Sequence, residues 1–204
     1  MDALLEALGQ TDIHLVDLMM KGKLAGVRAV LDVGAGRGRN LQLFSGLRCV
    51  ALDPDADRLA ECPEGVERIV GRVEEQDWAP AFDLVICCAV LHFATDEAAF
   101  ESMLRACWAA VAPGGILFVR TASDLAGRDF TVGDGVAPFF LSAEDCAGWT
   151  DRLGAAWEEP LRTSVVAGGR SMATWVLRKP VAGSHDQASS LEQSLKAAPE
   201  RPQK

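Results

Sequence analysis

The sequence lacks any long hydrophobic run. Its richest apolar stretch, Leu84 to Leu91, is far shorter than the roughly 18 unbroken apolar residues of a membrane span. The start of the chain, Met1 to Glu6, carries two acids and lacks the basic residues that begin a secretory signal. We therefore expect a cytoplasmic protein that does not bind a membrane.

Metal-ligand motifs are also lacking. The six cysteines form no C-x-x-C pair, and neither they nor the three histidines have the spacing of a zinc site. We expect no bound metal. We also expect reduced thiols, as is usual for proteins of the cytoplasm.

Basic residues are too few for a nucleic-acid surface. The chain has 20 Lys and Arg against 29 Asp and Glu, which gives a formal net charge of −9. A surface that binds duplex normally has a basic patch, and the sequence contains none. Nucleic acid is therefore a disfavoured partner, and a small neutral or cationic substrate fits this charge better.

What the sequence does contain is a run of closely spaced glycines after a mainly apolar stretch. Gly34, Gly36 and Gly38 follow the stretch Val27 to Val33. This pattern predicts a buried strand that turns tightly into a helix, because glycine permits positive φ angles and close approach of a ligand. The dinucleotide fingerprint G-x-G-x-x-G would need a further glycine where this chain has Arg39. The loop therefore suits a nucleoside-like ligand other than NAD.

Apolar periodicity and turn residues predict strands alternating with helices. We expect helices at 2–24, 38–44 and 55–61, from Asp96 to the stop at Pro113-Gly114-Gly115, and after the N-cap Ser142. We expect strands at 28–33, 48–52, 67–70, 82–88, 116–120, 161–166 and 172–177. The last two flank a short glycine-containing turn, which predicts an antiparallel hairpin.

This order of elements defines the fold class as α/β. We expect an open, mostly parallel sheet of seven strands, with helices on both faces and a closing antiparallel strand. One domain is expected over residues 1–180, in which 1–25 form a helical cap over the cleft. Apolar residues become scarce over 181–204, which predicts a disordered tail.

The sequence also contains four motifs in a characteristic order. They are Leu31-Asp32-Val33-Gly34-Ala35-Gly36-Arg37-Gly38, Asp53 after the second strand, Phe82 to Phe93 on the fourth strand, and Ala112-Pro113-Gly114-Gly115. With them, residues 10–179 resemble the class I S-adenosylmethionine (SAM)-dependent methyltransferases, which implies a Rossmann-like fold. Within that family the chain is similar to compact bacterial enzymes often named after tellurite resistance.

The resemblance implies that SAM is the cofactor and that its methyl group passes to a small-molecule acceptor by in-line displacement. The enzyme would be a monomer or a homodimer. Such a reaction depends on positioning and requires no metal. The alternative is a non-catalytic protein that binds SAM or S-adenosylhomocysteine (SAH) as a regulator or scaffold, because no unmistakable base is present. An NAD-dependent oxidoreductase is disfavoured by Arg39.

Several cofactor contacts follow from the resemblance. Asp53 lies 19 residues after Gly34, close to the spacing of about 20 for an acid that binds ribose; alternatively, it only starts the Asp-Pro turn. Asp32 would lie near the methionine end of SAM, or it would only bond amides of the glycine loop. Pro54 would flank the adenine. The loop would present its backbone to the cofactor at Gly34, Ala35, Gly36 and Gly38.

Arg72 departs from the family pattern. The residue after Gly71 is usually an acid that accepts a hydrogen bond from the adenine amino group, and arginine has no acceptor. Either Glu74 or Glu75 takes over this contact, or backbone groups of Arg72 and Val73 read the adenine.

Residues that end the fourth strand are expected beside the methyl group. Cys88 would contact the cofactor through its backbone; capture of a soft metalloid by Cys87 and Cys88 together is the alternative, although cysteine is common in buried strands. His92 is the best candidate for a general base, because histidine titrates near neutrality, or else it only packs locally.

Two further residues are candidates for the acceptor side. His14, in the first helix, is a candidate to cover the substrate pocket. Arg120 ends the fifth strand, at the carboxyl edge where ligands bind in open α/β sheets. It holds an anionic group of the substrate, or it pairs with Asp124.

Overall fold

The protein is built on one mixed sheet. The computed structural model describes residues 8–125, 139–166 and 171–181. Its strands follow the order β3-β2-β1-β4-β5-β8-β6, and β7 also pairs with β8. The strands are β1 (Ala29–Val33), β2 (Arg48–Asp53), β3 (Glu67–Val70), β4 (Phe82–Cys88), β5 (Val111–Ala122), β6 (Ala156–Trp157), β7 (Arg162–Val165) and β8 (Ser171–Arg178).

The direction of the strands confirms the predicted topology. From β3 to β5 every neighbouring pair is parallel, whereas β8 is antiparallel to β5, β6 and β7. The sheet has eight strands rather than the expected seven. The additional strand, β6, contains two residues, Ala156 and Trp157, and is too short to produce a recognisable alternation of apolar and polar residues.

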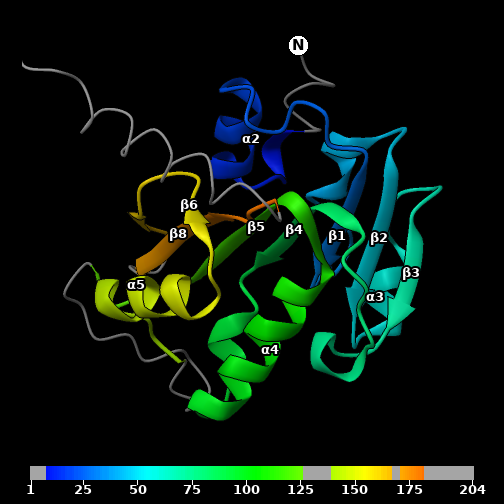
Figure 1. Cartoon of the computed structure of the whole chain (residues 1–204). Coiled ribbons are helices and arrows are strands. Elements are labelled where there is room, and N and C mark those ends of the chain that lie inside the picture. Colours follow the sequence, from blue (N-terminus) through cyan, green and yellow to red (C-terminus); the bar gives the residue numbers. More distant parts are fainter. Residues whose placement is uncertain (1–7, 126–138, 167–170, 182–204) are drawn as a thin grey trace, which may run out of the picture.

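Helices cover both faces of the sheet, as expected (Figure 1). The helical elements are α2 (Ile13–Met20), η1 (Leu41–Phe44), α3 (Ala56–Ala60), η2 (Val73–Glu75), η3 (Leu91–Phe93), α4 (Glu97–Ala110) and α5 (Ala143–Arg152). Side chains of α4 and α5 share one buried cluster with Leu31 and Val33 of β1. Side chains of α2, η1 and α3 share a second cluster with Val30. Because side chains alternate along a strand, the two clusters lie on opposite faces.

The amino-terminal region differs from the single helix expected over 2–24. Within the described part of it, α2 begins after Asp12, whose side chain accepts a hydrogen bond from the backbone N–H of His14 at 2.9 Å. An aspartate in this position starts a new helix, because it satisfies a free N–H group of the first turn. Residues 1–7, like residues 182–204 of the expected tail, lie outside the described residues. The helix expected at 38–44 is a short 3-10 helix, η1.

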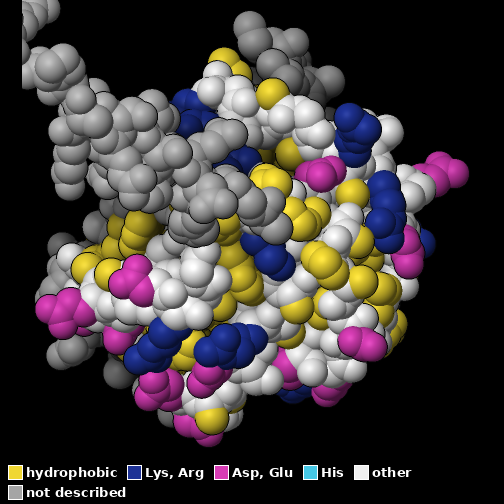
Figure 2. Space-filling model, in the orientation of Figure 1, with side chains coloured by type: hydrophobic (Ala, Val, Ile, Leu, Met, Phe, Trp, Pro, Cys, Tyr) yellow, Lys and Arg dark blue, Asp and Glu magenta, His cyan; other side chains and the backbone are white. Residues whose placement is uncertain are grey.

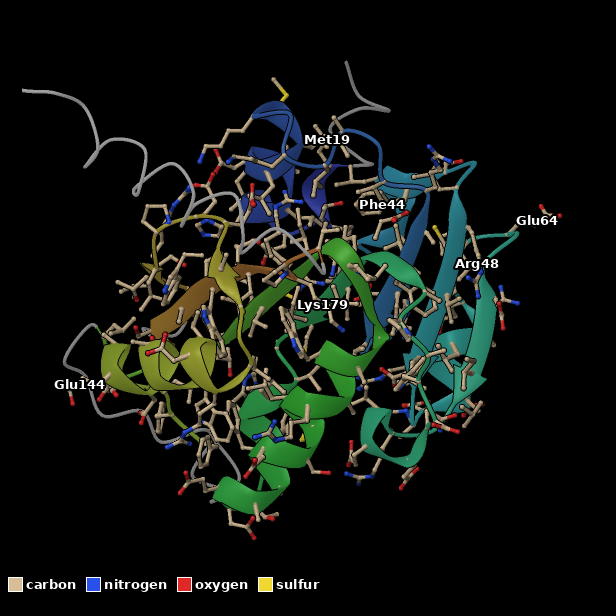
Figure 3. The ribbon with its side chains drawn as sticks, viewed as in Figure 1. Met19, Phe44, Arg48, Glu64, Glu144 and Lys179 are labelled. Atoms are coloured by element: carbon tan, nitrogen blue, oxygen red, sulfur yellow. The ribbon has the colours of Figure 1, made fainter. Side chains whose placement is uncertain are left out.

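The end of α4 is closed by the last described strand. The helix ends at Ala110 and β5 starts at once, whereas the sequence predicted a stop at Pro113 and a strand from 116. The ammonium group of Lys179 donates to the carbonyl oxygens of Trp108 and Val111, each at 2.9 Å, and lies 5.3 Å from the Trp108 ring (Figure 3). Lys179 therefore adds a charged donor to the last turn of α4 and to its C-cap residue, Val111.

The surface shows no gathering of basic side chains on the face in Figure 2. There Lys and Arg are dispersed among Asp and Glu. Among the described residues, no helix has the length and apolar character needed to cross a membrane.

Candidate functional site

The glycine loop follows the carboxyl end of β1 and is hydrogen-bonded to the carboxyl end of β2. Gly34, Gly36 and Gly38 have φ angles of 67°, 54° and 72°, as the sequence predicted for a tight turn. The backbone N–H group of Gly34 donates to the carbonyl oxygen of Leu52 at 2.8 Å. A Cβ atom on Gly34 would lie 2.2 Å from Cγ2 of Val90. Only glycine fits at this point of closest approach.

Asp53 connects the end of β2 to this loop. Its Oδ2 accepts a hydrogen bond from the backbone N–H of Gly36 at 2.8 Å, and its Oδ1 accepts one from the N–H of Asp55 at 2.9 Å. The second bond is the Asp-Pro turn contact that the sequence left as an alternative. Asp53 also lies on the wall of a cavity, so the turn contact and a ligand contact are compatible.

The cavity beside Asp53 has a volume of about 490 Å³ and lies at the carboxyl ends of β1 to β4. Ligands of open α/β sheets bind at this edge. The size is in the range of small-molecule and cofactor sites. Its lining residues are Val33, Gly34, Leu52, Asp53, Pro54, Arg58, Gly71, Arg72, Val73, Glu74, Ala89, Val90, Phe93, Thr95 and Met103.

The two acids after Arg72 have different roles in the structure. Glu75 accepts a hydrogen bond from the backbone N–H of Arg72 at 3.1 Å and thereby closes η2. Glu74 lines the cavity, and its Oε2 is buried without a hydrogen-bond partner among the described residues. A buried acceptor of this kind is costly unless a ligand or water satisfies it. Of the two acids, Glu74 is therefore the one whose carboxylate can accept a further hydrogen bond from a ligand in the cavity.

Asp32 is buried on the opposite face of β1 from Val33. It is 1% exposed, and its Oδ2 has no partner within the described part of the chain. Burial raises the pKa of Asp32 to about 7, although the charge of Arg39 and a hydrogen bond with Asn40 act in the other direction. Its side-chain contact is thus with Asn40 and not with the amides of the glycine loop.

The segment after β4 contains a backbone strain that the sequence did not reveal. Ala89 adopts a φ of 63°, and its N–H group donates to the carbonyl oxygen of Arg120 at 2.7 Å. A non-glycine residue rarely adopts this conformation, and such residues concentrate at functional sites. Ala89 and Val90 line the cavity.

His92 lies behind this segment rather than on the cavity wall. The residue is buried, its ring centroid is 4.6 Å from that of Phe93, and its carbonyl oxygen accepts a hydrogen bond from the N–H of Phe139. The exposed side chain of Phe93 lines the cavity instead.

Cys87 and Cys88 point to opposite faces of the sheet. Cys87 belongs to the cluster under α4, where it contacts Cys107, and Cys88 belongs to the cluster under α2. Burial raises the pKa of the Cys88 thiol to about 12. Joint capture of a metalloid by these neighbours is therefore contradicted by the alternation of side chains along β4. No group of three or more His, Cys, Asp or Glu in the described residues could hold a metal ion.

Arg120 is brought together with Asp12 instead of Asp124. Its Nη1 lies 3.4 Å from Oδ1 of Asp12, and its Nη2 donates to the hydroxyl of Ser164 at 3.2 Å. His14 lies close enough for the charge of Arg120 to lower its pKa, although burial is the larger cause. The sequence did not single out Asp12 or Ser164. The capping role of Asp12 offered a signal, whereas nothing local distinguishes Ser164.

The comparison with protein families agrees with this geometry. Residues 31–119, which include the glycine loop, Asp53 and β4, match the family model described as a methyltransferase domain. The match covers less than half of the chain. Together with the relative described below, it makes the chain similar to the class I SAM-dependent methyltransferases, and the solved structures share its fold. Two similar methyltransferase structures contain SAH or SAM, which supports SAM as the cofactor proposed below.

Individual methyltransferases are similar to the chain. The ubiquinone biosynthesis O-methyltransferase of Methylobacterium sp. (strain 4-46) is 29% identical over 202 residues, which covers 88% of this chain and 74% of that protein. Two solved structures share the fold. The 1,6-didemethyltoxoflavin-N1-methyltransferase of Burkholderia thailandensis has a TM-score of 0.63 at 19% identity and covers 81% of this chain and 76% of its own. A SAM-dependent methyltransferase of Methanosarcina mazei has a TM-score of 0.68 at 13% identity and covers 80% and 97%.

Proposed function

We propose that the protein transfers the methyl group of SAM to a small-molecule acceptor, with SAM bound in the cavity beside Asp53. The observation that carries this proposal is the position of Asp53. Its carboxylate holds the glycine loop through Gly36 and also lines the cavity of about 490 Å³. A carboxylate in this place can accept the hydrogen bonds of a ribose diol.

The other lining residues fit the remaining parts of the cofactor. Pro54 and Val73 would flank the adenine, and the unpartnered Oε2 of Glu74 would accept a hydrogen bond from its amino group. The glycine loop would present its backbone to the ligand at Gly34, which lines the cavity. A side chain at this position would collide with Val90. By the resemblance, Asp32 would face the methionine end, although it is not among the residues that line the cavity. The assignments of Glu74 and Gly34 use an acceptor and a close approach that are already built.

Catalysis would depend on positioning. Bound SAM supplies a methyl group activated by a positively charged sulfur. The protein would hold the acceptor in line with it and exclude water, which is sufficient for a direct displacement. A base is needed only for an acceptor that arrives protonated. Neither His92 nor His14 lines the cavity, so the proposal requires no histidine for an acceptor with a free lone pair.

The test is binding followed by turnover. SAH at 100 times its dissociation constant should stabilise the protein by roughly 2.7 kcal/mol, which raises the melting temperature by a few degrees. NAD at the same concentration is the control and should give no shift. A panel of acceptors is then assayed for SAH formation, with phenolic hydroxyl and ring-nitrogen compounds included, because the relatives' names specify O- and N-methyl transfer. Stabilisation by NAD in place of SAH would contradict the proposal.

A further inference from the structure

A polar row crosses the sheet beneath α2. Cys88, Arg120 and Thr174 lie in register on the neighbouring strands β4, β5 and β8. Cys88 and Val176 belong to the cluster under α2, so the row faces that helix. Arg120 and Thr174 are each 4% exposed. A cation and a hydroxyl are thus buried side by side near the carboxyl ends of β4 and β5.

The guanidinium of Arg120 has one edge that is not fully used. Its Nη1 faces Asp12 at 3.4 Å, which is a long contact, and its Nη2 donates to Ser164 at 3.2 Å. Its Nε has no hydrogen-bond partner among the described residues. Nε and Nη2 form the side edge of a guanidinium, whose two N–H groups match the two oxygens of a carboxylate.

Thr174 provides a second, independent observation. Its hydroxyl is buried and also lacks a partner within residues 8–125, 139–166 and 171–181. Thr174 is the register partner of Arg120 on the adjacent strand. Buried polar groups without partners are rare and mark the place of a ligand, water or ion. Two of them in adjacent positions point to a ligand with several oxygen atoms, for which the pocket at Thr174 has to open, because it has no room for a water molecule in this structure.

The local charges favour an anion. Two guanidinium groups lie near one carboxylate. Nη1 of Arg120 contacts Asp12 directly, and Nη2 of Arg39 is 3.3 Å from the sulfur of Cys88, which is 3.5 Å from Oδ2 of Asp12. Asp32 also faces Arg39, but burial keeps its pKa near 7, so its charge is incomplete at neutral pH.

The other ionisable groups around the row do not neutralise this excess of positive charge. Arg162 of β7 is paired with Asp17 and Glu159. Burial and the charge of Arg120 lower the pKa of His14, which favours its neutral form. One further negative charge therefore fits beside Arg120.

The row does not line the proposed cofactor cavity but is connected to it through Ala89, which lines the cavity, follows Cys88 and donates its N–H to the carbonyl oxygen of Arg120. Arg39 and Asn40 follow the glycine loop, and the side-chain oxygen of Asn40 accepts a hydrogen bond from the N–H of Asp12 at 3.2 Å. We propose that the methyl acceptor carries a carboxylate, which binds the Nε–Nη2 edge of Arg120 with the hydroxyl of Thr174 as a further donor. This inference rests on the proposed function and names the substrate class of the same site.

The experiment uses matched pairs of acceptors, in which one member carries a carboxylate and the other carries an uncharged amide in its place. The pairs are 3,4-dihydroxybenzoate with 3,4-dihydroxybenzamide, and 4-aminobenzoate with 4-aminobenzamide. Binding to the protein–SAH complex and SAH formation from SAM are measured for the full chain and for Arg120→Gln. Arg162→Gln is the matched control, because it removes a guanidinium from the neighbouring strand. Thr174→Val serves as a second variant that preserves side-chain shape.

The full chain should bind at least one carboxylate about tenfold more tightly than its amide, since a charge-assisted pair of hydrogen bonds is lost with the amide. Arg120→Gln should abolish this preference and leave the dissociation constant of SAH within about twofold. Thr174→Val should reduce the preference, and Arg162→Gln should retain it.

Three results would overturn the inference: equal binding of both members of every pair, an unchanged preference in Arg120→Gln, or an equal loss in Arg162→Gln. If Arg120→Gln fails to fold, an unchanged preference in Thr174→Val decides against the inference. Failure of the full chain to bind SAH would instead refute the proposed cofactor cavity. The two failures are thereby distinguished.

Discussion

The carboxylate of Asp53 accepts a hydrogen bond from the backbone N–H of Gly36 at 2.8 Å. This bond joins the end of β2 to the loop that follows β1, two segments that border the same cavity. One side chain therefore fixes the shape of the loop and faces the space in which we place the ribose. Removal of the carboxylate should affect both stability and ligand binding.

Asp53→Ala should weaken SAH binding by at least about tenfold and lower the free energy of unfolding by about 1–3 kcal/mol, because two backbone N–H groups lose a charged acceptor. Calorimetric titration with SAH and thermal unfolding measure the two effects. Asp57→Ala, at an exposed position on α3, is the control and should change neither. SAH affinity equal to that of the original protein would remove Asp53 from the cofactor site.

Glu74→Gln should weaken the preference for adenine. A carboxylate accepts a hydrogen bond from the adenine amino group, whereas the amide of glutamine can also donate to the exocyclic carbonyl oxygen of hypoxanthine. The affinity ratio of SAH to S-inosylhomocysteine should therefore fall by about tenfold, the effect of roughly 1.4 kcal/mol. Glu75→Gln is the matched control, since Glu75 is bonded to the backbone of Arg72. A ratio altered by Glu75→Gln alone would reverse the assignment.

Gly34→Ala and Gly36→Ala should differ in severity although both residues have positive φ angles. A Cβ on Gly36 meets no atom within 4 Å, whereas a Cβ on Gly34 would lie 2.2 Å from Val90. Gly36→Ala should cost about 1–2 kcal/mol of unfolding free energy for the backbone alone. Gly34→Ala should cost about 1–3 kcal/mol more for the collision. Denaturant unfolding measures both, and Gly34→Ala combined with Val90→Ala should recover part of the difference. Equal costs would show that the collision relaxes.

Asp32→Asn should change how stability depends on pH in the protein without cofactor. Burial raises the pKa of Asp32 from 3.8 to about 7, so between these values the folded state binds more protons than the unfolded state. Stability then falls as the pH rises through this window. Asparagine carries no charge, so the variant should match the original protein near pH 4 and exceed it by about 4 kcal/mol at pH 8. Parallel pH curves for the two proteins would show that Asp32 does not titrate in this window.

The parallel half of the fold was predictable because its signals are local. The ranges 67–70 and 82–88 coincide with β3 and β4, and Ser142 and Asp96 cap α5 and α4 as expected. The prediction of one amino-terminal helix was wrong, because the apolar pattern continues past Asp12 while the capping bond of that residue starts a new helix. The periodicity of apolar residues does not show whether a helix continues past a residue such as Asp12 or begins again at it.

The cofactor side of the site was largely indicated by spacing, whereas the acceptor side was not. Asp53 and the glycine loop are brought together as the interval between them suggested. The choice between Glu74 and Glu75 required the backbone contact of Arg72. The partner of Arg120 is 108 residues away in the chain, and no local pattern reports such a pairing. The net charge of the chain favoured a neutral or cationic substrate, whereas the inference above names an anionic one. A sum over all charged residues contains no information about one buried guanidinium.

The position of β8 has a consequence for the order of events during synthesis. This strand is the last one described in the chain, yet it pairs with β5, β6 and β7. Until it leaves the ribosome, β5 presents the unpaired backbone groups of an edge strand, which invite pairing with another nascent chain. Lys179 at the end of β8 also closes α4. A pause in translation before residue 171 would therefore expose an incomplete sheet with β5 as an unpaired edge strand. We expect chaperones to bind the nascent chain most during such a pause.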